Sequence, residues 1–132
     1  MKGERFDVYN VDYPVDCHIT SSDMVIILAN LLDNAIEACS KIENSSERKI
    51  RLVIRRINAM VMIKVENPCP QAPEVVGGKL MTNKKNKYDH GWGLVNVEDT
   101  AQKYEGSLRC TYDNERKVFF SAVNLVCRYD RT

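Results

Sequence analysis

Four polar side chains near the start of the chain recur at a spacing that could build a binding site. The stacked positions i, i+3, i+4 and i+7 of one helix face are occupied by Asn30, Asp33, Asn34 and Glu37. Asparagine is a poor helix former because its side chain competes for backbone hydrogen bonds. Amide oxygens beside a carboxylate are suitable ligands for a hard cation such as Mg²⁺, which also takes phosphate oxygens of a substrate as ligands. The alternative is an ordinary solvated face that tolerates two asparagines.

Two stretches further along the chain could hold phosphates. Gly91 and Gly93 stand just before an expected helix, where backbone N–H groups can approach an anion. The preceding residues 68–90 lack periodicity and carry a basic patch of Lys79, Lys84, Lys85 and Lys87. Taken alone, the glycines are also typical of a turn, and the lysines of a solvated loop. Together with the asparagines, they predict a nucleoside triphosphate site with Mg²⁺.

The asparagines need a helix to bring them together, and residues 21 to about 41 predict one. Thr20 or Ser21 can cap its free N–H groups, and Asp23 suits the positive end of the helix dipole. Apolar residues recur on the other side of this helix: Met24, Leu28, Leu31, Leu32, Ala35, Ile36 and Cys39. We therefore expect the apolar side to enter the core, opposite the polar face.

Alternating apolar residues predict a hairpin after this helix. Its strands are expected at residues 50–56 and 60–65, with a tight turn at Asn58-Ala59. The second strand should stop near Asn67, because the proline that follows cannot donate to a ladder.

The two ends of the chain predict further strands. Residues 1–19 indicate a lead-in of one or two short strands. After the glycine turn a helix should run to about Tyr104, followed by a closing hairpin of residues 107–112 and 117–126.

The composition is that of one ordinary domain, residues 1–132. Of its residues, 44% are hydrophobic and 28% charged, which is enough apolar material for a core. A net charge of +1 makes a nucleic-acid partner unexpected. Because the chain shows no signal peptide and no long apolar run, we expect no direct membrane contact by this piece.

Five cysteines are spread widely, without a Cys-x-x-Cys pair: Cys17, Cys39, Cys69, Cys110 and Cys127. Disulfide frameworks and zinc sites usually show closer, paired spacing. We therefore expect reduced thiols in a cytosolic protein, mostly buried as small hydrophobic residues.

Two motifs resemble those of a known superfamily. Residues 30–38, Asn-Leu-Leu-Asp-Asn-Ala-Ile-Glu-Ala, resemble the N box of the GHKL ATPase/kinase superfamily, and residues 90–97 resemble its second glycine box. The first motif is most similar to the catalytic domains of sensor histidine kinases of the peptide-quorum-sensing type. The resemblance covers residues 20–126. It agrees with the order of expected elements on an α/β two-layer sandwich, with a mixed, mostly antiparallel sheet of about five strands covered on one face by two or three helices.

The resemblance implies roles for the two asparagines. Asn34 matches the residue that binds the Mg²⁺ bridging the phosphates of ATP, and Asn30 matches the residue that assists this metal site. In the hydrolysing relatives the latter position holds a glutamate that activates water. Because asparagine cannot take a proton, Asn30 favours phosphoryl transfer to a protein side chain over ATP hydrolysis.

The resemblance also implies a phosphate-binding lid and turn. Gly91 and Gly93, followed by Leu94, match the glycine motif that bends around the phosphates. Thr82 and Lys84 lie in the stretch that matches the ATP lid, within residues 68–90, where a lysine could reach a phosphate.

The chain departs from the family pattern in two respects. The first glycine box of the superfamily has an aspartate that accepts a hydrogen bond from the adenine amino group, and here Asn67 stands in its place without the two glycines. An amide oxygen can still accept, but the charge-assisted part of the bond is lost. Neither His18 nor His90 lies on a long helix before the N box, so the phosphoacceptor histidine is missing.

The expected function is therefore that of a catalytic and ATP-binding domain of a histidine kinase. It would transfer the γ-phosphoryl group of ATP to a histidine on a separate dimerisation domain of the same full-length protein, with a response regulator acting downstream. The sensor and phosphoacceptor domains would precede residue 1, which implies a cytoplasmic domain of a membrane-anchored sensor. The alternative is a module of the same fold that binds nucleotide weakly or not at all and acts through protein contacts.

Overall fold

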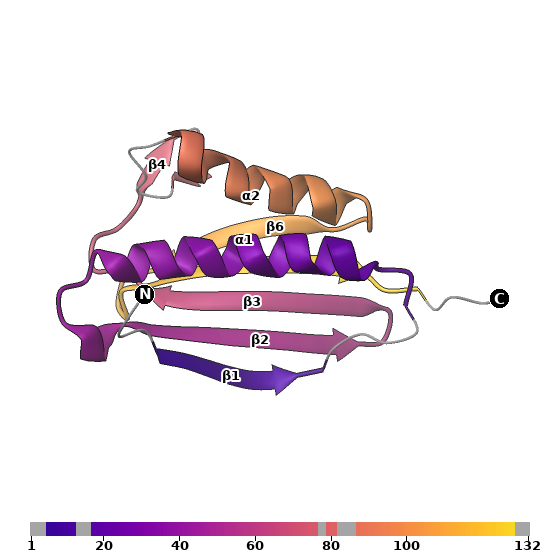
Figure 1. Ribbon diagram of the computed structural model, residues 1–132, viewed down its shortest axis with the longest axis horizontal. Helices are drawn as coiled ribbons and strands as arrows, with labels where there is room; N and C mark the ends of the chain where they lie inside the picture. The colour runs from indigo at the N-terminus through magenta and orange to yellow at the C-terminus, as the bar shows by residue number, and fades with distance from the viewer. Residues whose placement is uncertain (1–4, 13–16, 77–78, 82–86, 129–132) are drawn as a thin grey trace.

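Two helices lie on one face of a five-stranded sheet, as Figure 1 shows. The computed structural model describes residues 5–12, 17–76, 79–81 and 87–128. The helices are α1, Ser21–Ser40, and α2, Lys87–Gln102, and a short 3-10 helix, η1, covers Ser45–Glu47. In spatial order the strands are β1 (Arg5–Val11), β2 (Lys49–Ile57), β3 (Met60–Pro68), β7 (Val118–Val126) and β6 (Ser107–Asp113).

The sheet is mixed and mostly antiparallel, which confirms the predicted fold class. β1 pairs with β2 in parallel, and the other neighbours pair antiparallel. The two expected hairpins are present, and Asn58 takes the left-handed conformation that the tight β2–β3 turn requires, with φ of 56°. Parallel pairing of β1 was not predicted, because the long segment between β1 and β2 contains α1 and sequence alternation carries no direction.

Helix α1 forms as its sequence predicts and fills the centre of the core. The Thr20 side chain caps it by accepting a hydrogen bond from the backbone N–H of Asp23 at 3.1 Å. The buried side of the helix includes Met24, Leu31, Ala35 and Cys39, as expected, and also Ile27. These side chains pack on the inward-facing residues of the central strands, which are Val61, Ile63, Val65, Val123 and Leu125.

The prediction of an irregular loop over residues 68–90 is wrong at two places. β4, Glu74–Val76, pairs with β5, Lys79–Met81, as a separate two-stranded ladder. In the sequence, Gly77-Gly78 follows two valines and precedes Lys79-Leu80, a pattern that is typical of a two-residue hairpin. The prediction overlooked this pattern because it treated the segment as a basic loop. In addition, α2 already begins at Lys87.

The predicted glycine turn before the second helix is therefore also wrong. Gly91 and Gly93 lie inside α2, in its first two turns. Each glycine costs a helix only about 1 kcal/mol relative to alanine, and no proline interrupts this stretch. The helix continues through them because its packing against α1 and β6 outweighs this cost (Figure 1).

The expectation of five reduced thiols is wrong for one pair. Cys17 and Cys127 form a disulfide, with their Cα atoms 5.7 Å apart and a separation of 110 positions in sequence. The fold makes this contact by laying the segment before α1 along the end of β7, where the backbone N–H of His18 donates to the carbonyl of Arg128 at 3.0 Å. Such a long separation leaves no signal in cysteine spacing. The other three cysteines, Cys39, Cys69 and Cys110, form no disulfide.

Within the part of the chain that the structure describes, no helix is long and apolar enough to cross a membrane.

Candidate functional site

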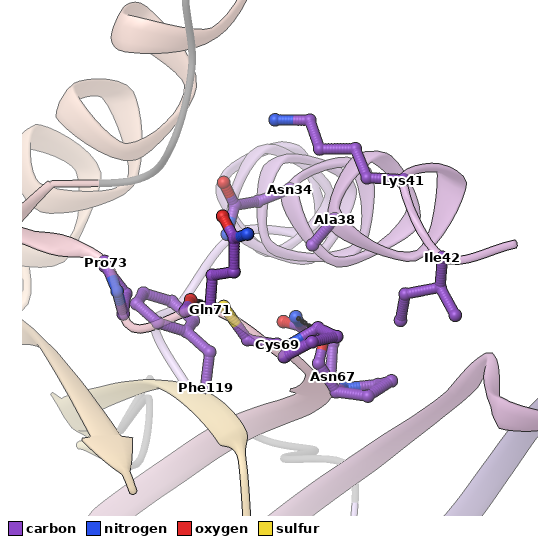
Figure 2. A pocket seen from close by; sticks show the side chains of 11 residues that line it. Asn34, Ala38, Lys41, Ile42, Asn67, Cys69, Gln71, Pro73 and Phe119 are labelled. Carbon is purple, nitrogen blue, oxygen red and sulfur yellow. Dashed lines mark hydrogen bonds between the residues drawn. The ribbon is translucent and has the colours of Figure 1, made fainter.

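A cavity of about 270 Å³ lies between the C-terminal half of α1 and the end of β3. Its walls come from α1, the end of β3, the segment that follows β3 and the start of β7 (Figure 2). The residues that line it are Asn34, Ala38, Lys41, Ile42, Asn67, Pro68, Cys69, Pro70, Gln71, Pro73 and Phe119. In Figure 1 the N-terminal turns of α2 and the β4–β5 hairpin lie at this same end of the molecule. Three segments far apart in sequence therefore meet around one apolar hollow with a few polar groups, which is the usual form of a small-molecule site.

Asn34 is the polar residue of α1 that faces this cavity. Its side chain is only 7% exposed, and its Oδ1 atom has no hydrogen-bond partner among the described residues. Figure 2 shows the side chain leaving α1 toward Gln71, which extends from the segment after β3. A buried carbonyl oxygen without a partner costs about 1–3 kcal/mol, so folding alone does not explain it. The position fits an oxygen that a bound cation or hydrogen-bond donor would satisfy.

Asn67 lies across the cavity at the end of β3 and is 2% exposed. Its Nδ2 donates to the carbonyl of Pro68 at 3.0 Å, which uses one donor of the amide and leaves Oδ1 as its acceptor. An acceptor held in an apolar wall can receive a hydrogen bond from an amino group on a flat ligand.

The end of β3 is held in place from the outer face of the sheet. Glu66, next to Asn67 but pointing the other way, is 6% exposed and pairs with Arg51 at 3.4 Å and with Arg116 at 3.6 Å. Arg51 lies on β2 and Arg116 in the turn between β6 and β7, so this carboxylate ties β3 to its hairpin partner and to the β6–β7 hairpin. These contacts fix the backbone that carries Asn67.

Asn30 does not line the cavity, although it lies one turn before Asn34. Its Nδ2 donates to the backbone carbonyl of Ile26 at 2.8 Å. Its Oδ1 lies against α2, only 3.2 Å from the place that a Cβ atom would take at Gly93. Glycine at position 93 therefore lets α2 approach α1 closely, and the amide of Asn30 occupies the boundary between the helices.

The remaining predicted site residues have different placements. Gly91 and Gly93 are in the first turns of α2, and Leu94 follows them with its side chain packed against the hydrophobic core. Thr82 and Lys84 lie outside the described residues. The structure thus brings Asn34 and Asn67 to one cavity and places Asn30 and Gly93 together beside it.

Sequence reasoning missed most of the cavity wall. Phe119 comes from β7 and faces the cavity because it pairs with Asn67 across the β3–β7 ladder. No local pattern could connect positions 52 residues apart in sequence. Cys69 and Gln71 could have been found, because they directly follow the strand end at Asn67.

Cys69 is the free thiol of this wall. Its backbone N–H donates to the carbonyl of Lys117 at 2.7 Å, and its carbonyl accepts from the Tyr112 hydroxyl at 2.7 Å. Burial raises the pKa of the Cys69 thiol above its usual value. The thiol is therefore a neutral, weakly polar part of the cavity at physiological pH.

A second polar cluster ties the ends of the two helices together at the far end of the molecule. The carboxylate of Asp23 is 8% exposed, accepts a hydrogen bond from the Tyr104 hydroxyl and lies 3.2 Å from the Lys103 ammonium. The hydrogen bond from Tyr104 lowers the pKa of Asp23, with Lys103 and Thr20 contributing in the same direction. This cluster stabilises the α1–α2 pair and is separate from the cavity.

The sequence matches the family model of the GHKL domain over residues 19–125. It is 29% identical over 97 residues to the sensor protein CitS of Bacillus subtilis (strain 168), an alignment that covers 70% of this chain and 17% of that protein. The chain therefore spans only a small part of the curated relative that it matches.

Solved histidine kinase structures share its fold. The catalytic domain of ThkA matches with a TM-score of 0.65 at 21% identity, covering 95% of this chain and 79% of that one. The kinase AdeS of Acinetobacter baumannii matches with a TM-score of 0.63 at 14% identity, covering 94% of this chain and 54% of that one. The histidine kinase domain of the blue-light-activated kinase from Erythrobacter litoralis matches with a TM-score of 0.62 at 17% identity, over 96% and 52% of the two chains.

Proposed function

The chain belongs to the GHKL domain family, and from this premise we propose that it is the ATP-binding catalytic domain of a two-component sensor histidine kinase. In this role it holds ATP in the cavity between α1 and the end of β3, with Mg²⁺ at the phosphates. Its reaction is transfer of the γ-phosphoryl group to a histidine on a separate helical domain. The likeness to a sensor protein and to three histidine kinase structures supports this choice within the family.

The observation that carries the proposal is the buried Oδ1 atom of Asn34. An amide oxygen without a partner, on the wall of a cavity, has the chemistry of a ligand for a hard cation. Mg²⁺ binds few protein atoms directly and keeps water and phosphate oxygens as its other ligands, so a single well-placed amide oxygen is a fitting contribution.

The other cavity residues fit the remaining parts of a nucleotide. Asn67 would accept a hydrogen bond from the exocyclic amino group of the base, while Phe119 and Ile42 supply apolar surface beside the ring. The base is thereby oriented while its flat faces are kept from water. Gly91, Gly93 and Leu94 would lie on the phosphate side, just after the N-terminal turn of α2, where the helix dipole favours negative charge.

Asn30 would act at the edge of the metal site. One N–H of its amide donates to the carbonyl of Ile26, and its oxygen would be the atom that assists Mg²⁺ or an ordered water. An amide cannot accept a proton at neutral pH, and the domain would therefore position ATP and stabilise charge without activating water. Thr82 and Lys84 are proposed as lid residues that reach the phosphates.

The phosphoacceptor would be the dimerisation domain of the same full-length protein, and a response regulator would act downstream. The full-length sensor is proposed to be membrane-anchored with this domain in the cytoplasm, as the match to a sensor protein supports. A domain without its own phosphoacceptor should bind nucleotide but leave itself unphosphorylated.

Isothermal titration of the purified domain with ADP tests this proposal, in the presence and absence of Mg²⁺. We expect binding that depends on Mg²⁺, and a loss of affinity of at least tenfold in Asn34→Ala. Asp33→Ala is the matched control, because Asp33 is exposed on the same helix next to Asn34 and does not line the cavity. Its affinity should equal that of the native domain.

A second assay tests phosphoryl transfer. The domain is mixed with a separately produced helical histidine domain and γ-labelled ATP, and label on the histidine is followed over time. Nucleotide binding without transfer would limit the chain to a binding function. The absence of any binding at millimolar ADP would refute the proposal and favour a module that acts through protein contacts. Steady release of free phosphate by the domain alone would contradict the role given to Asn30.

A further inference from the structure

Gln71 carries a polar side chain on the cavity wall that the proposed nucleotide site leaves without a role. Apart from the Cys69 thiol, the polar or charged side chains that line the cavity are those of Asn34, Lys41, Asn67 and Gln71. In the proposed site Asn34 binds the metal and Asn67 binds the base. Figure 2 shows Gln71 extending from the segment after β3 toward Asn34 on α1. Gln71 therefore lies beside the part of a nucleotide that joins its base to its phosphates.

Hydrogen bonds hold the backbone from which this side chain extends. The backbone N–H of Cys69 donates to the carbonyl of Lys117 at 2.7 Å, and the carbonyl of Cys69 accepts from the Tyr112 hydroxyl at 2.7 Å. The Sγ atom of Cys69 donates in turn to the carbonyl of Gln71 at 3.0 Å. Pro70 precedes Gln71, and its ring fixes the backbone angle φ there. The fold therefore sets the direction in which the Gln71 side chain leaves the backbone.

The side-chain amide of Gln71 is available to a ligand. The residue is exposed, and its amide forms no hydrogen bond to another described residue. A glutamine amide has two N–H donors and a carbonyl acceptor, and each hydroxyl of a sugar both donates and accepts. One amide can therefore pair with two neighbouring hydroxyls. Lys41 offers donors alone, and its ammonium group is better suited to a charged partner.

We propose that Gln71 recognises the ribose hydroxyls of the bound nucleotide and makes the site selective for nucleotides that carry them. With the base at Asn67 and the phosphates at the metal beside Asn34, the sugar lies between the two, where the Gln71 amide extends. Its Oε1 atom accepts a hydrogen bond from one hydroxyl, and its Nε2 donates to the other. Gln71 thus determines specificity and takes no part in phosphoryl transfer. This inference rests on the proposed nucleotide site.

Titration calorimetry with two nucleotides tests the inference. ADP and 2′,3′-dideoxy-ADP share their base and phosphates, and the second lacks both ribose hydroxyls. With Mg²⁺ present, the native domain should bind ADP about three- to tenfold more tightly, which corresponds to the net contribution of a hydrogen bond. Gln71→Ala should lose affinity for ADP by a similar factor and bind the two nucleotides equally to within about twofold. A purely structural role of Gln71 would weaken both nucleotides together and leave the ratio of their affinities unchanged.

Two further variants assign the preference. Gln71→Glu keeps acceptor oxygens for the hydroxyls and adds a negative charge near the phosphates, so both affinities should fall while the preference for ADP remains. Gln102→Ala is the matched control, because Gln102 is exposed at the end of α2 and does not line the cavity, and it should change neither affinity.

Three results would overturn the inference while leaving the nucleotide site intact. The native domain could bind ADP and dideoxy-ADP equally, or Gln71→Ala could keep the preference for ADP. In the third, the preference is lost in Lys41→Ala and kept in Gln71→Ala, which assigns the sugar contact to Lys41. A domain that binds neither nucleotide would refute the nucleotide site and this inference together.

Discussion

The strongest prediction concerns the stability of the empty domain when Asn34 is replaced by alanine. The Oδ1 atom of Asn34 is buried without a partner, which costs about 1–3 kcal/mol in the absence of ligand. Alanine removes that cost and improves helix propensity by up to about 0.7 kcal/mol. Against these gains stands the loss of packing by the amide, on the order of 1 kcal/mol, which is small because the side chain borders a cavity.

The net expectation is that Asn34→Ala stabilises the empty domain by about 1–2 kcal/mol. For a domain of this size that corresponds to a rise in Tm of roughly 4–8 °C. Asp33→Ala is again the control, because it changes helix propensity at an exposed position without removing a buried acceptor. It should raise Tm by no more than about 3 °C.

Ligand should stabilise the native domain more than the variant. Mg-ADP at about 100 times its native dissociation constant stabilises the native domain by roughly 2.7 kcal/mol, whereas Asn34→Ala with a tenfold weaker affinity gains only about 1.4 kcal/mol, and a still weaker variant gains less. Differential scanning calorimetry of both proteins, with and without Mg-ADP, measures this difference in the response to ligand. If empty Asn34→Ala unfolds below the native domain, Oδ1 is satisfied in the folded state and its assignment as a ligand for a cation loses its physical basis.

Three further predictions concern the frame around the site. Tyr104→Phe removes a hydrogen bond to the Asp23 carboxylate and should cost about 2 kcal/mol at pH 7 by urea unfolding. Because this bond lowers the pKa of Asp23, the loss of unfolding free energy in Tyr104→Phe is present above about pH 4. The loss should disappear as pH falls through the lowered folded-state pKa of Asp23, and a loss that persists in acid would contradict this prediction. Gly106→Ala places a Cβ atom 1.8 Å from the backbone carbonyl oxygen of Asn124 and should cost about 3 kcal/mol or leave the domain unfolded, whereas normal urea unfolding would show that the α2–β6 connection can shift. Thr20→Ala removes the cap of α1 and should cost about 1 kcal/mol, while a matching change at the exposed Ser22 should cost almost nothing in the same thermal scan.

The sequence predicted correctly those helix ends and turns whose conformation depends on residues nearby in the chain. The cap at Thr20 and the turn at Asn58 depend on residues within four positions, and both are present in the structure. The predictions failed where packing decides. Gly93 lies inside α2 because close approach to Asn30 compensates for its low propensity, and such a contact is invisible without the second helix. The disulfide of Cys17 likewise depends on where the chain ends of α1 and β7 meet.

The candidate site was predictable in part for the same reason. Helical spacing identified Asn34 as an unusual residue, and the strand end identified Asn67, but neither pattern shows that they face one cavity. That relation depends on β3 lying under α1 and on β7 bringing Phe119 into register with Asn67. Sequence periodicity predicts which face of a helix or strand a side chain lies on. A cavity forms where several helices and strands pack together, and periodicity does not predict that packing.

Asn30 and Asn34 occupy equivalent positions in the sequence pattern of α1, but their side chains have different surroundings in the folded domain. One turn apart on one helix, they were expected to act as a pair of metal ligands. In the structure one N–H of Asn30 donates to the carbonyl of Ile26 and its oxygen lies close to Gly93. Asn34 lines the cavity instead, and its oxygen is buried without a hydrogen-bond partner among the described residues. Movement of α2 relative to α1 would therefore change the surroundings of Asn30 first and leave Asn34 in place.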